Sequence, residues 1–204
     1  MPTPPHSTGG PDVFLQTERL VLRRFRRADV NLLVDLDSDP DVMRFITGGI
    51  ATPREEIEAE VLPAFLGYYD RYDGYGFWAA VEREPRVFVG WFHLRPAPEA
   101  PVDEPELGYR LNRAAWGRGL ATEGSRALID VAFTRLGARR VVAETMAVNA
   151  ASRRVMEKVG MRLVRSFHQD WPYRIEGEEH GDVEYAMTRA EWETRCQRRR
   201  GVAG

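Results

Sequence analysis

The chain has 204 residues, of which 43% are hydrophobic and 29% charged, and its formal net charge is −2. This composition is ordinary for a globular protein, and a charge so close to zero gives no general attraction to nucleic acid or to an anionic membrane. The single cysteine, Cys196, excludes an intrachain disulfide and a cysteine-based metal site, and no apolar run is as long as a membrane span. We therefore expect a cytoplasmic protein with no nucleic-acid partner, no membrane partner and no metal.

The length fits one domain with a sizeable core. Residues 1–12 are rich in Pro, Thr and Gly, and they predict a disordered lead. No internal repeat or second domain boundary follows, so residues 13–195 form the predicted domain. Residues 196–204 are rich in arginine and predict a basic, flexible tail.

The N-terminal half of this domain contains strands and helices. Arg19 to Phe25 alternates as a strand does, and Arg27 to Ser38 carries leucines at helical spacing. A second helix begins at Thr52-Pro53, with Thr52 as the N-cap, and runs to about Arg71. Two β-rich runs separated by a short polar turn then predict a hairpin: Phe77 to Val81 and Val87 to Leu94.

The C-terminal half begins after a loop rich in Pro and acidic residues, 96–105. A strand, Glu106 to Leu111, is followed by a glycine-rich turn and by a helix whose apolar residues recur with a period near 3.6 until Gly137. The remaining elements are, in order, a strand, a helix, two strands and a short helix: Val141 to Thr145, Asn149 to Val159, Met161 to His168, Val183 to Met187, and a helix from Thr188.

The glycine-rich turn, Trp116-Gly117-Arg118-Gly119-Leu120-Ala121-Thr122-Glu123, is the most informative segment. Its two glycines allow a tight turn that brings backbone N–H groups together, and the helix that follows adds unpaired N–H groups and the positive end of its dipole. The turn therefore predicts a site for a pyrophosphate. A Walker loop would need Gly-Lys-Ser/Thr, which is missing, and the dinucleotide pattern Gly-x-Gly-x-x-Gly/Ala fails at its last position.

The same turn resembles the pyrophosphate loop of the GNAT N-acetyltransferases, Gln/Arg-x-x-Gly-x-Gly/Ala. Gly119 and Ala121 match its last two defined positions, and Trp116 stands where Gln or Arg is usual, a departure typical of the RimJ/RimL-like branch. Three other stretches resemble the first strand, the fourth strand and the Asn-x-x-Ser helix of that branch: Thr17 to Arg23, Glu106 to Tyr109, and Asn149 to Met161. The resemblance extends from about Thr17 to Trp192.

This resemblance implies an α/β (α+β) GNAT fold. Its central sheet would be mixed and mostly antiparallel, with about six to seven strands and helices on its flanks. A V-shaped splay would separate the fourth strand, Glu106–Leu111, from the fifth, Val141–Thr145. Backbone groups left unpaired in the splay would bond to pantetheine, and an N–H group near Tyr109 to Leu111 would polarise the acetyl carbonyl.

Acetyl-CoA is the implied cosubstrate, and an amine is the implied acceptor. Trp116 is expected to pack beneath the loop or to touch the cofactor, and Arg118 either reaches a phosphate or lies on a solvated helix face. The residues that the resemblance assigns to cofactor binding are Tyr109, Leu111, Trp116, Gly117, Arg118, Gly119, Leu120, Ala121, Thr122, Asn149 and Ser152.

The amine must lose a proton, and Glu106 is the first candidate base because strand alternation places it on one face with Gly108 and Arg110. A solvated strand carboxylate is the alternative explanation for it. Glu144 is the second candidate, and His168 and Asp170 are weaker ones. Ser152 matches the residue that protonates the leaving thiolate in this branch, whereas Asn149 is expected either to bond to pantetheine or to cap its helix.

The acceptor is less sharply defined. Two aromatic segments lie where the family lines its acceptor cleft: Tyr68 to Trp78, and Phe167 to Tyr173. Aromatic walls there suit an amine or a short peptide, and packing in the core or in a homodimer is the other explanation. The expected reaction is acetyl transfer to a protein N-terminal α-amine or a small-molecule amine. Two alternatives remain: detoxification of an amine antibiotic, with Asp70, Asp73 and Asp170 facing the cation, and an acyl-CoA sensor without turnover.

Overall fold

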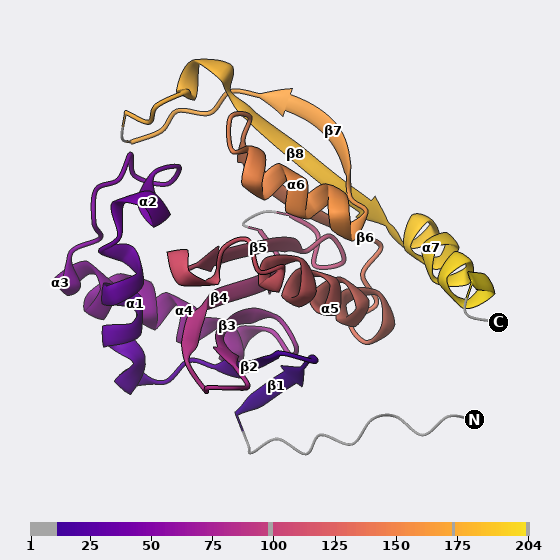
Figure 1. Cartoon of the computed structure of the whole chain (residues 1–204), viewed down its shortest axis with the longest axis horizontal. Coiled ribbons are helices and arrows are strands. Elements are labelled where there is room, and N and C mark those ends of the chain that lie inside the picture. The colour runs from indigo at the N-terminus through magenta and orange to yellow at the C-terminus, as the bar shows by residue number, and fades with distance from the viewer. Residues whose placement is uncertain (1–11, 98–99, 173, 203–204) are drawn as a thin grey trace.

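The computed structural model describes residues 12–97, 100–172 and 174–202, which form one mixed sheet with helices on both faces (Figure 1). Eight strands occur in these ranges: β1 Val13–Gln16, β2 Leu20–Arg24, β3 Gly76–Glu82, β4 Phe88–Arg95, β5 Glu106–Leu111, β6 Arg140–Met146, β7 Arg162–Phe167 and β8 Asp182–Thr188. Their order across the sheet is β1-β2-β3-β4-β5-β6-β8-β7. Neighbours are antiparallel except β5 and β6, so the predicted mixed, mostly antiparallel sheet is confirmed.

The strand that sequence alternation did not reveal is β1. Its four residues pair with β2 as a short antiparallel edge, and alternation over four residues carries little signal. The expected fourth and fifth strands are therefore β5 and β6. The expected disordered lead, residues 1–12, lies outside the described residues except for Asp12.

Helices cover both faces of the sheet. Their bounds are α1 Val30–Asp37, α2 Pro40–Met43, α3 Arg54–Glu56, α4 Leu62–Arg71, α5 Leu120–Thr134, α6 Ala150–Val159 and α7 Arg189–Val202. A π-helical segment, Ile57–Val61, joins α3 to α4, so the predicted helix from residue 52 to residue 71 is nearly continuous. In the described ranges no helix is long and apolar enough to cross a membrane.

Helix α7 continues to Val202 and so includes most of the segment predicted as a basic, flexible tail, 196–204, whose flexibility stays a prediction. Residues 203–204 lie outside the described residues. The helix is held at its beginning: Trp192 packs against Phe133 of α5 and donates its Nε1–H to Asp130 at 2.6 Å. These contacts hold the beginning of α7 against α5.

Two cores lie on opposite faces of β3 and β4. On one face Trp78 and Phe92 pack with α5, and on the other Phe77 and Trp91 pack with Phe65 of α4 and with α1. This alternation follows from the two-residue period of a strand. The outermost strand, β7, leaves Leu163 and Val164 half exposed. The homodimer that the sequence analysis considered stays a prediction.

Helix α5 approaches β4 closely at Gly124. A Cβ atom at that position would lie 2.4 Å from Phe92 Cζ, whereas one at Gly67 in α4 would meet nothing within 4 Å. We expect Gly124→Ala to lower the free energy of unfolding by about 1–3 kcal/mol through overpacking. Gly67→Ala, the matched helical control, should raise it by roughly 0.5–1 kcal/mol. Urea unfolding of both variants measures this, and equal shifts would contradict the close packing.

Candidate active site

The sheet splits between β5 and β6. These parallel strands share one paired position, Glu106 with Val142, and the Val142 amide donates to the Pro105 carbonyl at 3.0 Å. Beyond that point they diverge, and Figure 1 shows β7, β8 and α6 lying away from β2, β3 and β4 on the far side of the split. The predicted splay is therefore present, and it leaves an edge of β5 without a strand partner.

Glu106 lies where the splay begins, and its side chain is only 23% exposed. Its Oε2 is 2.9 Å from Arg95 Nη2, and its Oε1 is 3.7 Å from His93 Nε2. Burial raises the pKa of Glu106 above its usual value, and Arg95 opposes this only in part. The Glu106 carboxylate is thus partly buried and more basic than usual. It is not the solvated strand carboxylate that was the alternative explanation.

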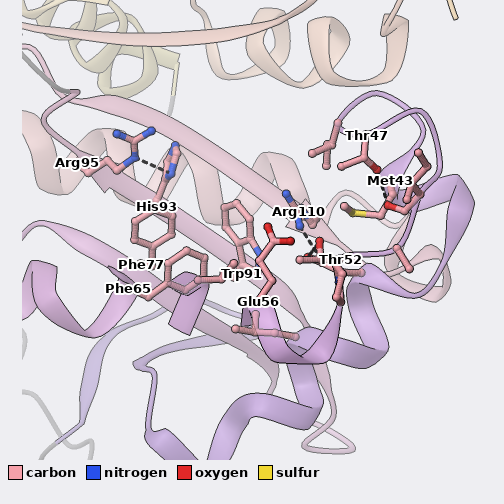
Figure 2. A pocket seen from close by; sticks show the side chains of 17 residues that line it. Met43, Thr47, Thr52, Glu56, Phe65, Phe77, Trp91, His93, Arg95 and Arg110 are labelled. Atoms are coloured by element: carbon pink, nitrogen blue, oxygen red, sulfur yellow. Dashed lines mark hydrogen bonds and ion pairs between the residues drawn. The ribbon is translucent and has the colours of Figure 1, made fainter. Parts of the chain in front are cut away.

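His93 and Arg95, the two neighbours of the Glu106 carboxylate, line a cavity of about 500 Å³ between the sheet and the α1–α4 region. Figure 2 shows side chains from β3, β4 and β5 facing those of α3, α4 and the segment after α2. Arg110 Nη1 pairs with Asp37 Oδ1 at 2.5 Å, and Thr52 donates to Asp37 Oδ2 at 2.9 Å. The sequence predicted that Thr52 caps its helix. Its side chain instead binds a residue of α1. The lining includes Met43, Ile46, Ile50, Glu56, Phe65, Phe77, Trp91, His93, Arg95 and Arg110.

Only part of the predicted aromatic zones reaches this cavity. Phe77 lines it, but Trp78 is buried on the opposite face, and the Tyr69 hydroxyl accepts a hydrogen bond from the Phe25 amide at 2.9 Å. In the second zone, Trp171 donates to Asp182 at 3.3 Å, and Tyr173 lies outside the described residues. Core packing therefore accounts for most of the aromatic residues in the first zone.

The other predicted bases are less favourably placed. Glu144 on β6 is exposed, and partial burial together with the carboxylates of Glu106 and Glu184 raises its pKa. His168 and Asp170 are exposed residues after β7, and His168 Nε2 lies 3.3 Å from the Glu179 carbonyl. The structure thus brings Glu144 near Glu106 and leaves His168 and Asp170 in a connecting loop.

Tyr109 and Ser152 form a pair that links β5 to α6. The Tyr109 hydroxyl donates to the Ser152 carbonyl at 3.1 Å and lies 3.0 Å from Ser152 Oγ. Burial raises the pKa of Tyr109 to about 12, although the bond with Ser152 opposes the shift. The phenol therefore stays protonated at neutral pH. Sequence analysis assigned only the backbone of Tyr109 to the site, while alternation along β5 would have placed its ring opposite Glu106.

Asn149 acts as a helix cap. Its Oδ1 accepts from the Ser152 amide at 3.1 Å, and its Nδ2 donates to Thr145 at 3.1 Å. Of the two expected roles, the structure shows this one, and the cap fixes Ser152 at the first turn of α6.

The glycine-rich loop follows β5 and ends at α5. Gly117 and Gly119 have φ values of 70° and 78°, a region that side chains disfavour, and Gly119 is the N-cap without a side-chain cap. The first N–H groups of α5 have no intrahelical acceptor. Leu120 is buried, Ala121 and Thr122 are half-buried, and the two glycines with Arg118 are exposed. The predicted anion site thus has an open face.

Trp116 and Leu111 connect this loop to β5. The Trp116 Nε1–H donates to the Leu111 carbonyl at 2.8 Å, while 48% of Trp116 is exposed. About half of Trp116 is therefore covered, and both expected roles, packing beneath the loop and touching the cofactor, stay predictions. Leu111 itself is buried in the core beside α5.

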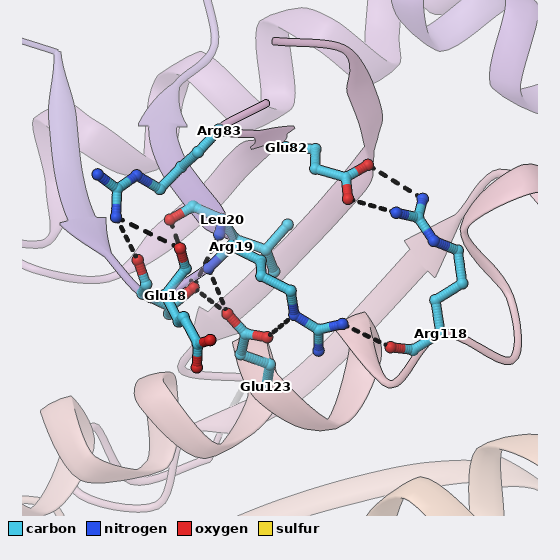
Figure 3. A network of polar contacts seen from close by, with 8 residues as sticks. Glu18, Arg19, Leu20, Glu82, Arg83, Arg118 and Glu123 are labelled. Atoms are coloured by element: carbon cyan, nitrogen blue, oxygen red, sulfur yellow. Dashed lines mark hydrogen bonds and ion pairs between the residues drawn. The ribbon is translucent and has the colours of Figure 1, made fainter. Parts of the chain in front are cut away.

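A polar network fixes the loop to the turn between β1 and β2 and to β3 (Figure 3). Glu123 accepts from Thr17 Oγ1 at 2.6 Å, from the Arg19 amide at 2.8 Å and from Arg19 Nε at 2.6 Å. Arg19 also donates to the Arg118 carbonyl at 2.8 Å, and the Arg118 guanidinium pairs with Glu82 through both terminal nitrogens. Arg118 is therefore held by β3, which leaves the backbone of the loop to meet an anion.

Sequence reasoning missed Glu123 and Arg19 as partners, since 104 residues separate them. Burial alone would raise the pKa of Glu123, but the bonds from Thr17 and Arg19 outweigh it and lower that pKa. The carboxylate stays charged at the positive end of α5, where the helix dipole favours it.

Comparisons with known proteins agree with this architecture. A family model described as an acetyltransferase (GNAT) domain matches residues 19–162. The FsC-acetyl coenzyme A-N(2)-transacetylase of Aspergillus fumigatus is 36% identical over 185 residues, which cover 87% of this chain and 77% of that protein. The putative ribosomal N-acetyltransferase YdaF of Bacillus subtilis is 34% identical over 88 residues, covering 43% and 47%.

Among solved structures, a GNAT-family acetyltransferase from Bacillus anthracis superposes with a TM-score of 0.69 at 24% identity, covering 86% of this chain and 98% of that one. The fold is therefore shared with a GNAT acetyltransferase. The protein belongs to the GNAT family of N-acetyltransferases.

Proposed function

We propose that the protein transfers the acetyl group of acetyl-CoA to a primary amine by direct attack in a ternary complex. The observation that carries this is the arrangement around β5. Glu106 lies on one face of the strand, next to His93 and Arg95 of the cavity wall, and the Tyr109–Ser152 pair lies on the other face beside the splay. A base for the amine and a donor for the thiolate thus stand on opposite sides of one strand.

The residues present fit the cosubstrate. At Gly117 a Cβ would meet nothing within 4 Å, so the loop leaves room for a bulky anion. The uncapped start of α5 supplies backbone donors for pyrophosphate, and the unpaired edge of β5 supplies backbone groups for the peptide-like pantetheine arm. When bound, acetyl-CoA supplies the acetyl group and the thiolate leaving group.

Each proton then has an assigned carrier. Glu106 takes the proton that the amine nitrogen loses as its bond to the acetyl carbon forms. The hydroxyl pair of Tyr109 and Ser152 gives a proton to the sulfur as the carbon–sulfur bond breaks. An N–H group of β5 near Tyr109 to Leu111 stabilises the negative charge that develops on the acetyl oxygen.

The names of two relatives point to different acceptors. One protein is named for transfer to the N(2) position of FsC, and the other for a ribosomal acceptor. The resemblance to the RimJ/RimL-like branch favours a protein N-terminus. The cavity lining carries two arginines, Arg95 and Arg110, and two carboxylates, Asp37 and Glu56. Arg110 is paired with Asp37, and Arg95 with Glu106, so the charges of the cavity favour neither a neutral nor a cationic acceptor.

Mass spectrometry of a reaction tests this function. Acetyl-CoA is mixed with the protein and with peptides that begin with Ser or Ala, free amino acids, polyamines and aminoglycosides. An acetylated amine in the first two groups is expected. Acetyl-CoA binding by calorimetry with no acetylated product would instead support a sensor, and no binding would contradict the assignment of the loop.

The Glu123 anchor provides a further prediction. We expect Glu123→Gln to raise the Kd for acetyl-CoA by about 3- to 10-fold, because the charged acceptor that fixes the start of α5 is lost. Glu58→Gln, which removes an exposed carboxylate paired with Arg54, is the matched control. Calorimetry measures both, and equal affinities in the two variants would contradict the role of the anchor.

A further inference from the structure

Three side chains in the wall of the cavity carry buried hydrogen-bond donors without partners. Trp91 Nε1, His93 Nε2 and Arg110 Nε are three of the six buried side-chain atoms with no partner in the described residues. All three belong to cavity-lining residues on the adjacent strands β4 and β5, and Trp91 and Arg110 are directly opposite each other in the register. Buried polar groups are normally satisfied, so three such donors in one wall indicate a ligand that carries oxygen acceptors.

The proton position on His93 follows from its neighbour. Arg95 Nε can only donate, and it lies 3.3 Å from His93 Nδ1, so Nδ1 accepts. Burial and the charges of Arg95 and Arg110 hold the pKa of His93 well below its usual value, and the ring is neutral. A neutral ring with an accepting Nδ1 carries its hydrogen on Nε2. His93 Nε2 is therefore an N–H donor without an acceptor in the described residues.

Gly108 makes room for this ring. It is the direct partner of His93 on β5, and a Cβ at Gly108 would lie 2.2 Å from His93 Nε2. The glycine thus lets the imidazole lie across β5 beside Glu106, with Nε2 3.7 Å from Glu106 Oε1.

This spacing matches a particular chemical unit. In the group N–Cα–C=O, the nitrogen and the carbonyl oxygen are separated by roughly 3 Å, as the covalent bond lengths dictate. An amine that gives its proton to Glu106 therefore places the oxygen of an adjacent carbonyl within reach of the His93 Nε2–H. A simple alkylamine leaves that donor without an acceptor, and kcat/KM for such an amine should therefore be lower.

We propose that His93 is a specificity residue, whose Nε2–H binds the carbonyl oxygen next to the acceptor amine, so that the preferred acceptors are α-amino acyl compounds. This rests on the proposed acetyl transfer and on Glu106 as its base. Trp91 and Arg110 offer two more donors to the next oxygen of an amide or peptide acceptor. A free amino acid and a peptide N-terminus share the recognised unit, and the assay separates these two sources.

Two amines of similar size test the proposal: alaninamide, which has the carbonyl, and 2-aminobutane, which lacks it. The measured quantity is the ratio of their kcat/KM values, compared between variants so that the different basicities of the amines cancel. His93→Phe should lower this ratio about tenfold or more, since the donor is lost while the aromatic shape remains. His93→Gln, which keeps a donor, should restore it to within about threefold.

Tyr75→Phe is the control variant. It removes another buried, unpartnered polar atom that lies outside the cavity lining, and it should leave the ratio unchanged. Alanine and an Ala-initiated peptide, assayed in parallel, distinguish a free carboxylate from a peptide carbonyl. If wild type and His93→Phe discriminate equally, the proposal is overturned even though acetyl transfer stands.

Binding without turnover distinguishes the specificity role of His93 from the proposed acetyl transfer. Alaninamide and 2-aminobutane are titrated by calorimetry into wild type and His93→Phe, each loaded with CoA. A preference for alaninamide that disappears in His93→Phe supports the specificity role even where no amine is acetylated, and in that case only the proposed function fails. No preference in the wild type overturns the specificity role.

Discussion

Replacing Glu106 by Gln is expected to lower kcat/KM for amine acetylation by about 10²- to 10⁴-fold at neutral pH, the range typical for loss of a general base. The amide keeps the shape and the hydrogen bond from Arg95 but cannot accept a proton. Acetyl-CoA affinity should stay unchanged, because the glycine loop lies at the other end of β5. Steady-state kinetics and calorimetry measure the two effects.

The pH dependence gives this prediction a second readout. Only the carboxylate form of Glu106 acts as a base, so kcat/KM of the wild type falls as the pH drops through a pKa that burial has raised above the usual glutamate value. That acid limb should disappear in Glu106→Gln. Glu144→Gln is the comparison, and it should retain activity within about threefold, as expected for an exposed carboxylate. Loss of activity in Glu144→Gln but not in Glu106→Gln would transfer the role of base to β6.

Removing the hydroxyls of the Tyr109–Ser152 pair should have the second largest effect. We expect Ser152→Ala and Tyr109→Phe each to lower kcat by roughly 10- to 100-fold. This is a smaller loss than the one expected for Glu106→Gln, because a thiolate is a weak base and leaves readily even without a proton donor. The double variant should lose less than the product of the single effects, since the two hydroxyls bond to each other.

Acetyl-CoA binding again provides the control, because both single variants should bind it within about threefold of wild type. The high pKa of Tyr109, about 12, also predicts no loss of activity from its ionisation across the ordinary assay range. Multiplicative losses would indicate that the hydroxyls act separately, and unchanged kcat in both variants would remove the pair from the mechanism.

The sequence made the framework of the site predictable because short-range rules determine it. Two glycines before a helix specify the loop, and the two-residue period of β5 correctly places Glu106 on one face with Gly108 and Arg110. Ser152 was predicted through the family resemblance. Its contact with Tyr109 was not predicted, since strand alternation indicates the face on which a residue lies but not the residue that it contacts across the splay.

The acceptor cavity was beyond sequence reasoning for a different reason. Its walls come from α1, the segment after α2, β4 and β5, and the Asp37–Arg110 pair joins residues 73 positions apart. His93 is one polar residue in an otherwise apolar run, and its role depends on Arg95, Gly108 and Glu106 together. Thr52 resembled a helix cap by local rules, but tertiary contact with Asp37 took precedence.

We infer that the splay and the glycine loop together form the acetyl-CoA site. Hydrogen–deuterium exchange of the protein with and without acetyl-CoA tests it most directly. We expect amides of β5 and of Gly117 to Thr122 to exchange about tenfold more slowly in the presence of the ligand, because they become hydrogen-bonded. Protection confined to other elements, with these two segments unchanged, would contradict it.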